Sequence, residues 1–324
     1  MTRMIEVSTP ARLHFGLTNF AGEGRQFGGL GMMVDHGGIN LRISPADTFR
    51  ANGPLCQRVE AFASSFAAHH QLAALPACQI DVVSSSPEHT GLGVGTQLGL
   101  AVTAGVGEWL GMTWRDANLL SKVSGRGRRS AVGTHGFLHG GLLVDAGKLP
   151  EEPLGQLAER VELPAEWRFV LIRQSARHGL AGGAETAAID SLPSVPSEVT
   201  QYLRQLIDTQ ILPAARNTDW HRFSQAIYDY GHEAGECFAA VQGGPFASPE
   251  IAKLVHTVRE LGVPGVGQSS WGPTVFAITT DWQSAENLVG QLQQHPHCEQ
   301  YQFAITQANN SGARVVTTPD ATQE

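Results

Sequence analysis

Residues 87–97 read Pro-Glu-His-Thr-Gly-Leu-Gly-Val-Gly-Thr-Gln and join a predicted strand (residues 77–84) to a predicted helix that ends near residue 110. Three glycines between Gly91 and Thr96 leave backbone N–H groups unshielded by side chains. These groups stand at the start of the helix, where the helix dipole favours an anion. The stretch therefore predicts a phosphate cradle. The alternative is a turn that is glycine-rich only because a strand and a helix pack closely.

Two familiar nucleotide motifs do not fit this stretch. GxxxxGK followed by Ser or Thr is absent, and Thr96 stands where GxGxxG requires its third glycine. The spacing therefore supports neither a P-loop nor a Rossmann site.

A second glycine-rich stretch, residues 124–133, holds Arg126, Arg128 and Arg129 within four positions. Guanidinium groups can bind phosphate through two parallel N–H donors, so this loop is a candidate phosphate clamp. A solvated basic turn is the alternative. His135 and His139 follow at the spacing of one helix face, but glycines at 136, 140 and 141 weaken a helix there, so we expect satisfied or surface histidines rather than a zinc site.

Composition narrows the class of protein. The 324 residues include 30 Asp and Glu against 22 Lys and Arg, a net charge of -8 that opposes binding to nucleic acid or anionic lipid and favours a small-molecule partner. The four cysteines stand far apart, which predicts free thiols in a reducing cytoplasm. No run is apolar enough to predict a membrane span.

The remaining pattern predicts two α+β domains. The segment of residues 147–164, rich in Pro, Glu and Gly, marks a boundary between them. A loop after the strand at 167–173 carries the titratable residues Arg177, His178 and Glu185, and the polar residues 317–324 predict a frayed tail. Further strands are predicted at 3–8, 39–44, 141–145, 274–280 and 301–306, and further helices at 56–75, 116–123, 219–241, 249–261 and 281–293.

Four stretches, read together, resemble the GHMP superfamily of small-molecule kinases and, within it, the β-ribofuranosylaminobenzene 5'-phosphate synthases. They are PARLHFG (10–16), PEHTGLGVGTQ (87–97), GRGRRSAVGTHGFLHGGLLVD (125–145) and GQSSWGPTVF (267–276). The resemblance implies a two-domain α+β fold. Its parts are a ribosomal protein S5 domain 2-like domain at residues 1–160, which carries the glycine-rich phosphate loop, and a ferredoxin-like domain at 161–324, with the site in the cleft between them.

Departures from the kinase pattern separate the subfamilies. Many GHMP kinases carry SGxD, whose acid deprotonates the substrate hydroxyl, but here the run is Ser130-Ala-Val-Gly133. The basic residue often found as Lys in the first motif is Arg12. These differences favour a non-kinase. An ATP-dependent small-molecule kinase and a non-catalytic ligand sensor remain the alternatives.

The resemblance implies a decarboxylating ribosyl transfer early in tetrahydromethanopterin synthesis, in which 5-phosphoribosyl diphosphate (PRPP) and 4-aminobenzoate or 4-hydroxybenzoate give an aryl riboside phosphate, CO2 and diphosphate. It implies Mg2+, with ligands that the sequence does not identify, a cytoplasmic enzyme, no nucleic acid or membrane partner, and compatibility with a homodimer. The expected catalytic residues are Arg12, His14 and Asp145, of which Arg12 and His14 face the acceptor carboxylate. The expected phosphate ligands are Gly91, Gly93, Gly95, Thr96, Gln97, Arg126 and Arg128. Ser269, Ser270 and Trp271 are expected to frame the acceptor ring, although Trp271 in a Gly-Pro turn also fits a packing role.

Overall fold

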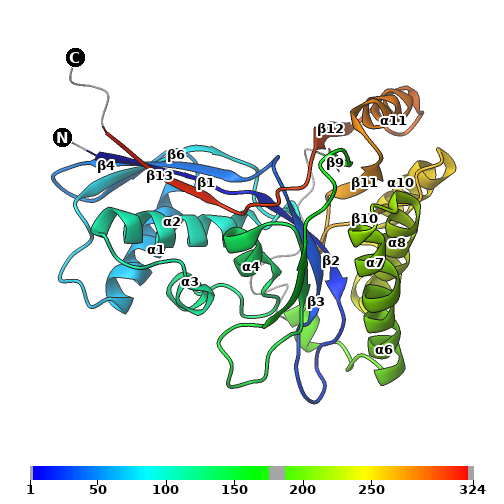
Figure 1. Ribbon diagram of the computed structural model, residues 1–324, viewed down its shortest axis with the longest axis horizontal. Helices are drawn as coiled ribbons and strands as arrows, with labels where there is room; N and C mark the ends of the chain where they lie inside the picture. Colours follow the sequence, from blue (N-terminus) through cyan, green and yellow to red (C-terminus); the bar gives the residue numbers. More distant parts are fainter. Residues whose placement is uncertain (1–2, 175–186, 320–324) are drawn as a thin grey trace.

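The computed structural model describes residues 3–174 and 187–319, and it confirms the predicted α+β class. A five-stranded sheet at one end has the order β13-β1-β4-β6-β5. Its strands alternate buried and exposed residues because helices cover only one of its faces, as Figure 1 shows. The bounds are β1 (Arg3–Ser8), β4 (Ile39–Pro45), β5 (Arg50–Asn52), β6 (Cys78–Ser85) and β13 (Arg314–Pro319).

Three helices pack against this sheet and its neighbour: α1 (Cys56–His69), α2 (Val94–Leu110) and α4 (Val132–His139). Helix α3 (Ala117–Ser124) packs on these helices. Helix α1 ends earlier than the predicted residue 75. Gln71 adopts a left-handed φ of 52°, and Leu72 N–H donates to the Ala67 carbonyl, which closes the helix as a Schellman turn does.

A helix forms around His135 although the sequence predicted that glycines would weaken it, and it ends before Gly140. Helix α4 forms because it packs tightly on the neighbouring sheet: a Cβ at Gly136 would lie 2.2 Å from Met33 Sδ. That glycine permits close packing, which offsets its poor helix propensity.

A second sheet, of order β2-β3-β7-β8, lies in the middle of the molecule. Its strands are β2 (Ala11–Leu17), β3 (Gly29–Val34), β7 (Leu142–Asp145) and β8 (Leu157–Val161). All six residues of β3 are buried, since this strand is enclosed on both faces.

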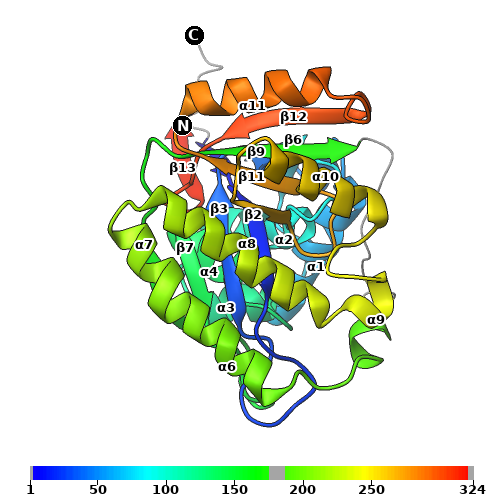
Figure 2. The same cartoon turned by 90° about the vertical axis from the view of Figure 1, so that its right-hand side faces the viewer.

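The third sheet has the order β10-β11-β9-β12, with antiparallel neighbours throughout. Counted along the chain, β9 (Arg168–Gln174), β10 (Val266–Gln268), β11 (Val275–Thr279) and β12 (Tyr301–Thr306) are interrupted by helices after the first and third strands, which is the ferredoxin-like pattern. Figure 2 shows α10 and α11 on this layer and α6, α7 and α8 below it. The helical elements are α6 (Ser197–Leu206), η1 (Ile207–Ile211, one π-helical turn), α7 (Leu212–Arg216), α8 (Trp220–Glu236), α9 (Ala239–Gln242), α10 (Pro249–Glu260) and α11 (Trp282–Gln294).

Helix α8 connects this layer to the central sheet. A Cβ at Gly16 of β2 would lie 2.4 Å from Ala234 Cβ, so glycine is needed for the helix to approach the strand. Tyr230 is fully buried there, and its hydroxyl donates to the Gly16 carbonyl at 2.9 Å. This close contact fixes one wall of the space beside β2.

The predicted frayed tail is wrong for residues 317–319. They belong to β13, which pairs with β1 from Arg3↔Pro319 to Ser8↔Arg314, so the chain returns to its first sheet. Within the residues that the structure describes, no helix combines the length and apolarity needed to cross a membrane.

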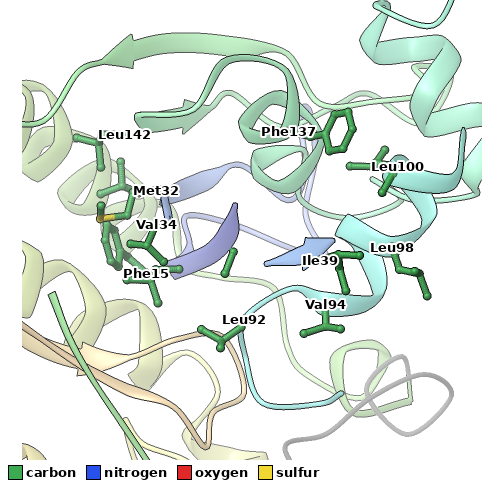
Figure 3. Close-up of a cluster of buried hydrophobic side chains, with 14 of the residues drawn as sticks. Phe15, Met32, Val34, Ile39, Leu92, Val94, Leu98, Leu100, Phe137 and Leu142 are labelled. Carbon is green, nitrogen blue, oxygen red and sulfur yellow. The ribbon is translucent and has the colours of Figure 1, made fainter. Parts of the chain in front are cut away.

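The main core extends beneath the glycine-rich stretch. Figure 3 shows Leu92, Val94 and Leu98 among buried side chains that include Ile39 and Phe137. Leu92 and Val94 are both buried, whereas the glycines that alternate with them are partly exposed. The alternation anchors the loop to the core through its apolar residues and leaves its backbone at the surface.

Candidate active site

A cavity of about 570 Å3 lies where five segments meet. They are the glycine loop (residues 87–97), strand β2, the arginine loop (residues 124–133), helix α8 and the turn before β11. Its position between the N-terminal and C-terminal sheets agrees with the cleft expected from the sequence. Ten predicted site residues line it: Arg12, His14, Gly91, Gly93, Gly95, Thr96, Arg126, Arg128, Ser270 and Trp271.

The glycine loop forms the N-terminal end of α2. Gly93 is the residue before the helix, has a left-handed φ of 73°, and offers no side chain to cap the first turn. A Cβ there would lie 3.2 Å from Arg12 Cβ. The uncapped first turn therefore reaches the cavity beside the Arg12 side chain, an arrangement that suits an anion.

Gly91 serves the contact between the two halves of the molecule. A Cβ at this position would lie 2.4 Å from the Ser269 carbonyl oxygen. Ser269 Oγ donates to the Gly91 carbonyl at 2.8 Å and accepts from His14 N–H at 3.1 Å. These bonds hold the glycine loop against the turn at residues 269–272, so the predicted phosphate and acceptor subsites adjoin.

The arginine loop reaches the glycine loop through Arg126. Its Nη2 and Nε donate to Thr96 Oγ1 at 3.1 and 3.3 Å. Arg128 is exposed, and both Arg128 and Arg129 line the cavity. Together with Arg12, these side chains give the cavity a strongly positive wall in a protein of net charge -8.

Arg58 and Glu88 also line the cavity and were not predicted from the sequence. Arg58 comes from α1, and its Nη2 lies 2.8 Å from where a Cβ of Gly95 would stand. It forms an ion pair with Glu88, and burial lowers the pKa of its guanidinium. A single arginine on an amphipathic helix gives no sequence signal; only the fold shows that α1 lies beside the glycine loop.

A hydrogen-bonded chain runs from the cavity into the interior. His14 Nε2 lies 3.0 Å from Ser130 Oγ, which donates to Asp145 Oδ2 at 3.2 Å. Asp145 also accepts from Ala131 N–H at 2.5 Å and from Gly147 N–H at 2.9 Å. Because an ionised carboxylate only accepts, the Ser130 hydroxyl accepts from His14, which places the histidine proton on Nε2.

Burial controls the titration of both ends of this chain. It lowers the pKa of His14 to about 3, aided by the charge of Arg12. It raises the pKa of Asp145 to about 6, against the effect of the hydrogen bonds from Ala131, Gly147 and Ser130. At neutral pH, His14 is therefore uncharged and Asp145 is ionised.

Three predicted site residues do not line the cavity: Gln97, Ser269 and Asp145. Gln97 is buried and its Nε2 donates to the Gly133 carbonyl at 3.0 Å. Ser269 and Asp145 are buried within the hydrogen bonds described above. In this structure, these three side chains hold the loops that carry the cavity-lining residues.

Another part of the lining, which includes Trp271 of the turn at residues 269–272, is largely apolar. Trp271 and Phe238 meet edge to face with ring centroids 5.0 Å apart, and Phe246, Ala234 and Ile189 complete the lining on this side. Phe238 lies within the helix predicted at 219–241, but α8 ends at Glu236, before Phe238. The place of Phe238 beside Trp271 depends on the fold. The cavity thus combines a cationic wall with an aromatic one.

The position where many kinases of the superfamily carry an acid lies beside Arg12. A Cβ at Gly133 would stand 3.0 Å from Thr96 Cγ2 and 3.8 Å from Arg12 Cδ. Without a side chain, Gly133 supplies no carboxylate to this part of the site.

The two histidines of α4 lie away from any cluster of metal ligands. His135 bonds to the Gly155 carbonyl at 2.8 Å, and burial lowers the pKa of its ring. Across residues 3–174 and 187–319, no three His, Cys, Asp or Glu side chains gather to hold a metal ion. The predicted titratable residues Arg177, His178 and Glu185 lie outside the described residues.

Comparison with known proteins supports the fold. Residues 211–298 match the family model described as GHMP kinases C terminal. Homoserine kinase from Cytophaga hutchinsonii superposes with a TM-score of 0.62 at 15% identity, over 97% of each chain. The chain has the GHMP kinase fold. At this level of identity the likeness concerns the fold alone.

Curated proteins of known name resemble the chain more closely in sequence. The β-ribofuranosylphenol 5'-phosphate synthase of Archaeoglobus fulgidus is 29% identical over 330 residues, which cover 96% of this chain and 99% of the relative. The protein of the same name from Methanothermobacter thermautotrophicus is 27% identical over 296 residues, covering 85% and 88%. The resemblance to synthases that was stated from the four motifs is therefore confirmed along nearly the whole chain.

Proposed function

We propose that this GHMP-fold protein is a decarboxylating phosphoribosyltransferase that joins PRPP to 4-hydroxybenzoate and releases CO2 and diphosphate. The observation that carries the proposal is the pairing of a cationic, glycine-lined pocket with an aromatic wall in one cavity. The names of the two relatives support it, because decarboxylation of 4-hydroxybenzoate at the attacked carbon leaves a ribofuranosylphenol phosphate.

The cationic wall suits the donor. As the bond between C1 of the ribose and the diphosphate oxygen breaks, negative charge builds up on the leaving group. The first turn of α2 and the guanidinium groups of Arg12 and Arg126 are placed to stabilise that charge as it develops. They are already in position because packing and the Arg126–Thr96 hydrogen bonds hold them there. The volume of about 570 Å3 is within the usual range for ligand pockets and leaves room for an aromatic ring beside the donor.

The aromatic wall suits the acceptor. The ring carbon that bears the carboxylate attacks C1, the C–C bond forms as the C–O bond breaks, and loss of CO2 returns the electron pair to the ring. A para hydroxyl group pushes electrons toward the attacking carbon. Trp271 and Phe238 offer faces and edges against which such a ring can pack.

His14 can assist at the acceptor hydroxyl or hold the ring in place through its unprotonated Nδ1. Its Nε2–H is held by Ser130, and Ser130 is held by Asp145, so the chain fixes the tautomer of the imidazole. Because this histidine is uncharged, Arg12 is the better candidate for attracting the acceptor carboxylate.

Mg2+ fits this site as an ion that arrives with the diphosphate. The described residues hold no cluster of three ligating side chains, whereas the cavity offers the oxygen donors Glu88 and Thr96 beside the cationic wall. When bound, Mg2+ would neutralise charge on the leaving diphosphate.

The decisive experiment supplies the purified protein with PRPP, Mg2+ and either 4-hydroxybenzoate or 4-aminobenzoate, and measures CO2 and the mass of the product. A C-riboside phosphate with matching CO2 supports the proposal, and the preferred benzoate identifies the acceptor. A parallel assay with ATP and small alcohols tests the kinase alternative. Release of ADP at about 1 to 100 per second with no CO2 would replace the proposal by a kinase function. If the protein turns over neither PRPP nor ATP, a ligand-sensing function is favoured.

A further inference from the structure

Glu88 is the one carboxylate among the described residues that line the cavity, and it stands in the glycine-rich loop itself. The other charged residues on that wall are the arginines 12, 58, 126, 128 and 129. A carboxylate in a pocket built for a polyanion repels the expected ligand. A role for Glu88 in binding must therefore include an interaction that outweighs this repulsion.

The ion pair with Glu88 engages the Arg58 guanidinium, a group that could otherwise bind phosphate. The Arg58 guanidinium lies against Gly95 in the first turn of α2, where an anion would bind, yet its charge is directed to Glu88. The two side chains keep about a third and a quarter of their surface exposed, so both can change partner without unfolding the loop. Because the pair is only partly buried, water competes for both side chains and the ion pair can be exchanged for another partner.

We propose that Glu88 and Arg58 exchange partners when a divalent cation enters with diphosphate: Glu88 becomes a ligand of the cation, and Arg58 turns to the phosphate oxygens. This inference rests on the proposed function, because it concerns the metal–diphosphate part of the donor. Mg2+ in phosphate sites commonly takes one or two carboxylates and completes its shell with phosphate oxygens and water. One carboxylate in a pocket that binds phosphate matches that pattern, and the five arginines are placed to bind the phosphate oxygens.

The exchange makes ligand selection depend on the metal. Without metal, Glu88 competes with diphosphate for Arg58 and repels the anion. With metal, the same carboxylate attracts the complex and releases Arg58. Glu88 therefore discriminates against the bare anion in favour of its metal complex.

The test is calorimetric titration with inorganic diphosphate, in EDTA and in excess Mg2+, on the wild type and on Glu88→Gln. We expect Glu88→Gln to bind diphosphate about tenfold more tightly in EDTA and about tenfold more weakly in Mg2+, the effect of gaining or losing one charged interaction. The matched control is Glu60→Gln, which removes the same charge from an exposed position two residues from Arg58. It should leave both affinities within about twofold.

Arg58→Gln supplies the second variant. It should weaken diphosphate binding most in Mg2+, where Arg58 is free to bind phosphate, by about tenfold. With Mn2+ as a spectroscopic probe, diphosphate should immobilise the ion on the wild type and less so on Glu88→Gln. Equal shifts of the Glu88→Gln affinity in both solutions, or no shift in either, would overturn the proposal. Because neither PRPP nor turnover is used, failure of the proposed reaction would be seen separately, in the CO2 assay.

Discussion

Gly93 lacks a side chain for two physical reasons, one of the backbone and one of space. Its φ of 73° disfavours any L-residue, and the position of its missing Cβ is close to the Arg12 side chain. Gly111, at the other end of the same helix, has a similar φ of 67° but nothing within 4 Å of its missing Cβ. The two glycines therefore separate backbone strain from the local contact in the cavity.

We predict that Gly93→Ala and Gly111→Ala lose similar stability, about 1 to 2 kcal/mol each, because both place alanine in left-handed backbone. Only Gly93→Ala should weaken diphosphate binding, by about tenfold, since its methyl group pushes Arg12 and the first helical turn apart. Chemical denaturation and calorimetry check the two parts. Equal affinities for the two variants would show that the Gly93 contact has no bearing on the anion.

His14 makes stability depend on pH. Its pKa is lowered from 6.5 to about 3 by burial, so between these values the unfolded chain binds the proton and the folded protein does not. The free energy of unfolding therefore falls as the pH falls below about 6.5. His14→Gln keeps an N–H donor for Ser130 but cannot titrate.

The expected measurement is a difference between two pH values. From pH 7 to pH 5 the wild type should lose about 2 kcal/mol of unfolding free energy relative to His14→Gln. Urea titrations of both proteins at each pH give the comparison, and groups that do not contact residue 14 cancel in the difference. His14→Gln keeps the N–H donor to Ser130, so that the hydrogen bond from Ser130 to Asp145 is retained in both proteins. A gap that stays constant with pH would mean that His14 is not held neutral.

At the scale of elements, the arginine loop and the glycine loop act as one surface because Arg126 joins them through Thr96. Gly127 permits the turn: its φ is 74°, and a Cβ there would lie 2.4 Å from Leu154 Cδ1. The loop is thus fixed by packing on one side and by the Arg126 fork on the other.

We predict that Arg126→Lys lowers kcat/KM for PRPP about tenfold, because lysine keeps the charge but loses the two donors that reach Thr96. Arg128→Lys, at an exposed position in the same loop, keeps the charge that lines the cavity and should lose less, about threefold or less. If Arg126→Lys matches the wild type, the loop contributes charge alone. Should the reaction be absent in the wild type, diphosphate affinity gives the same comparison.

Local pattern predicted most elements but not their neighbours. The C-terminal end of α1 was missed because it depends on Gln71 in left-handed backbone. Helix α4 was missed because it depends on the tight contact of Gly136 with Met33. The sequence does not show whether Gly136 breaks a helix or allows a helix to pack closely against a strand. The place of Arg58 in the cavity was missed for a related reason, because the packing of α1 against α2 is tertiary structure that local sequence patterns do not predict.

At the scale of the whole molecule, the four motifs predicted from the sequence converge on one cavity although up to 260 residues separate Arg12 from the turn at Gly272. Their convergence depends on helix α8 lying against β2 at Gly16 and on the bonds from Ser269 and Thr274 to the glycine loop. The motifs predicted which segments line the cavity. They did not distinguish the side chains on the wall from those, such as Gln97, that hold the wall in place.

We predict that a chain ending at Ala313 is less stable than one ending at Pro319 by at least about 3 kcal/mol, because it loses the ladder between β13 and β1 and the partly buried Val315. Thermal unfolding of the two chains makes the comparison. Equal melting temperatures would show that β1 needs no partner on that edge.

The pairing of β1 with β13 also bears on synthesis. Translation delivers β13 more than 300 residues after β1. Throughout that interval β1 presents an open edge to the ribosome's surroundings, where other nascent chains and chaperones are present. The first sheet is therefore completed only when β13 pairs with β1, and that pairing closes an edge at which other chains could add.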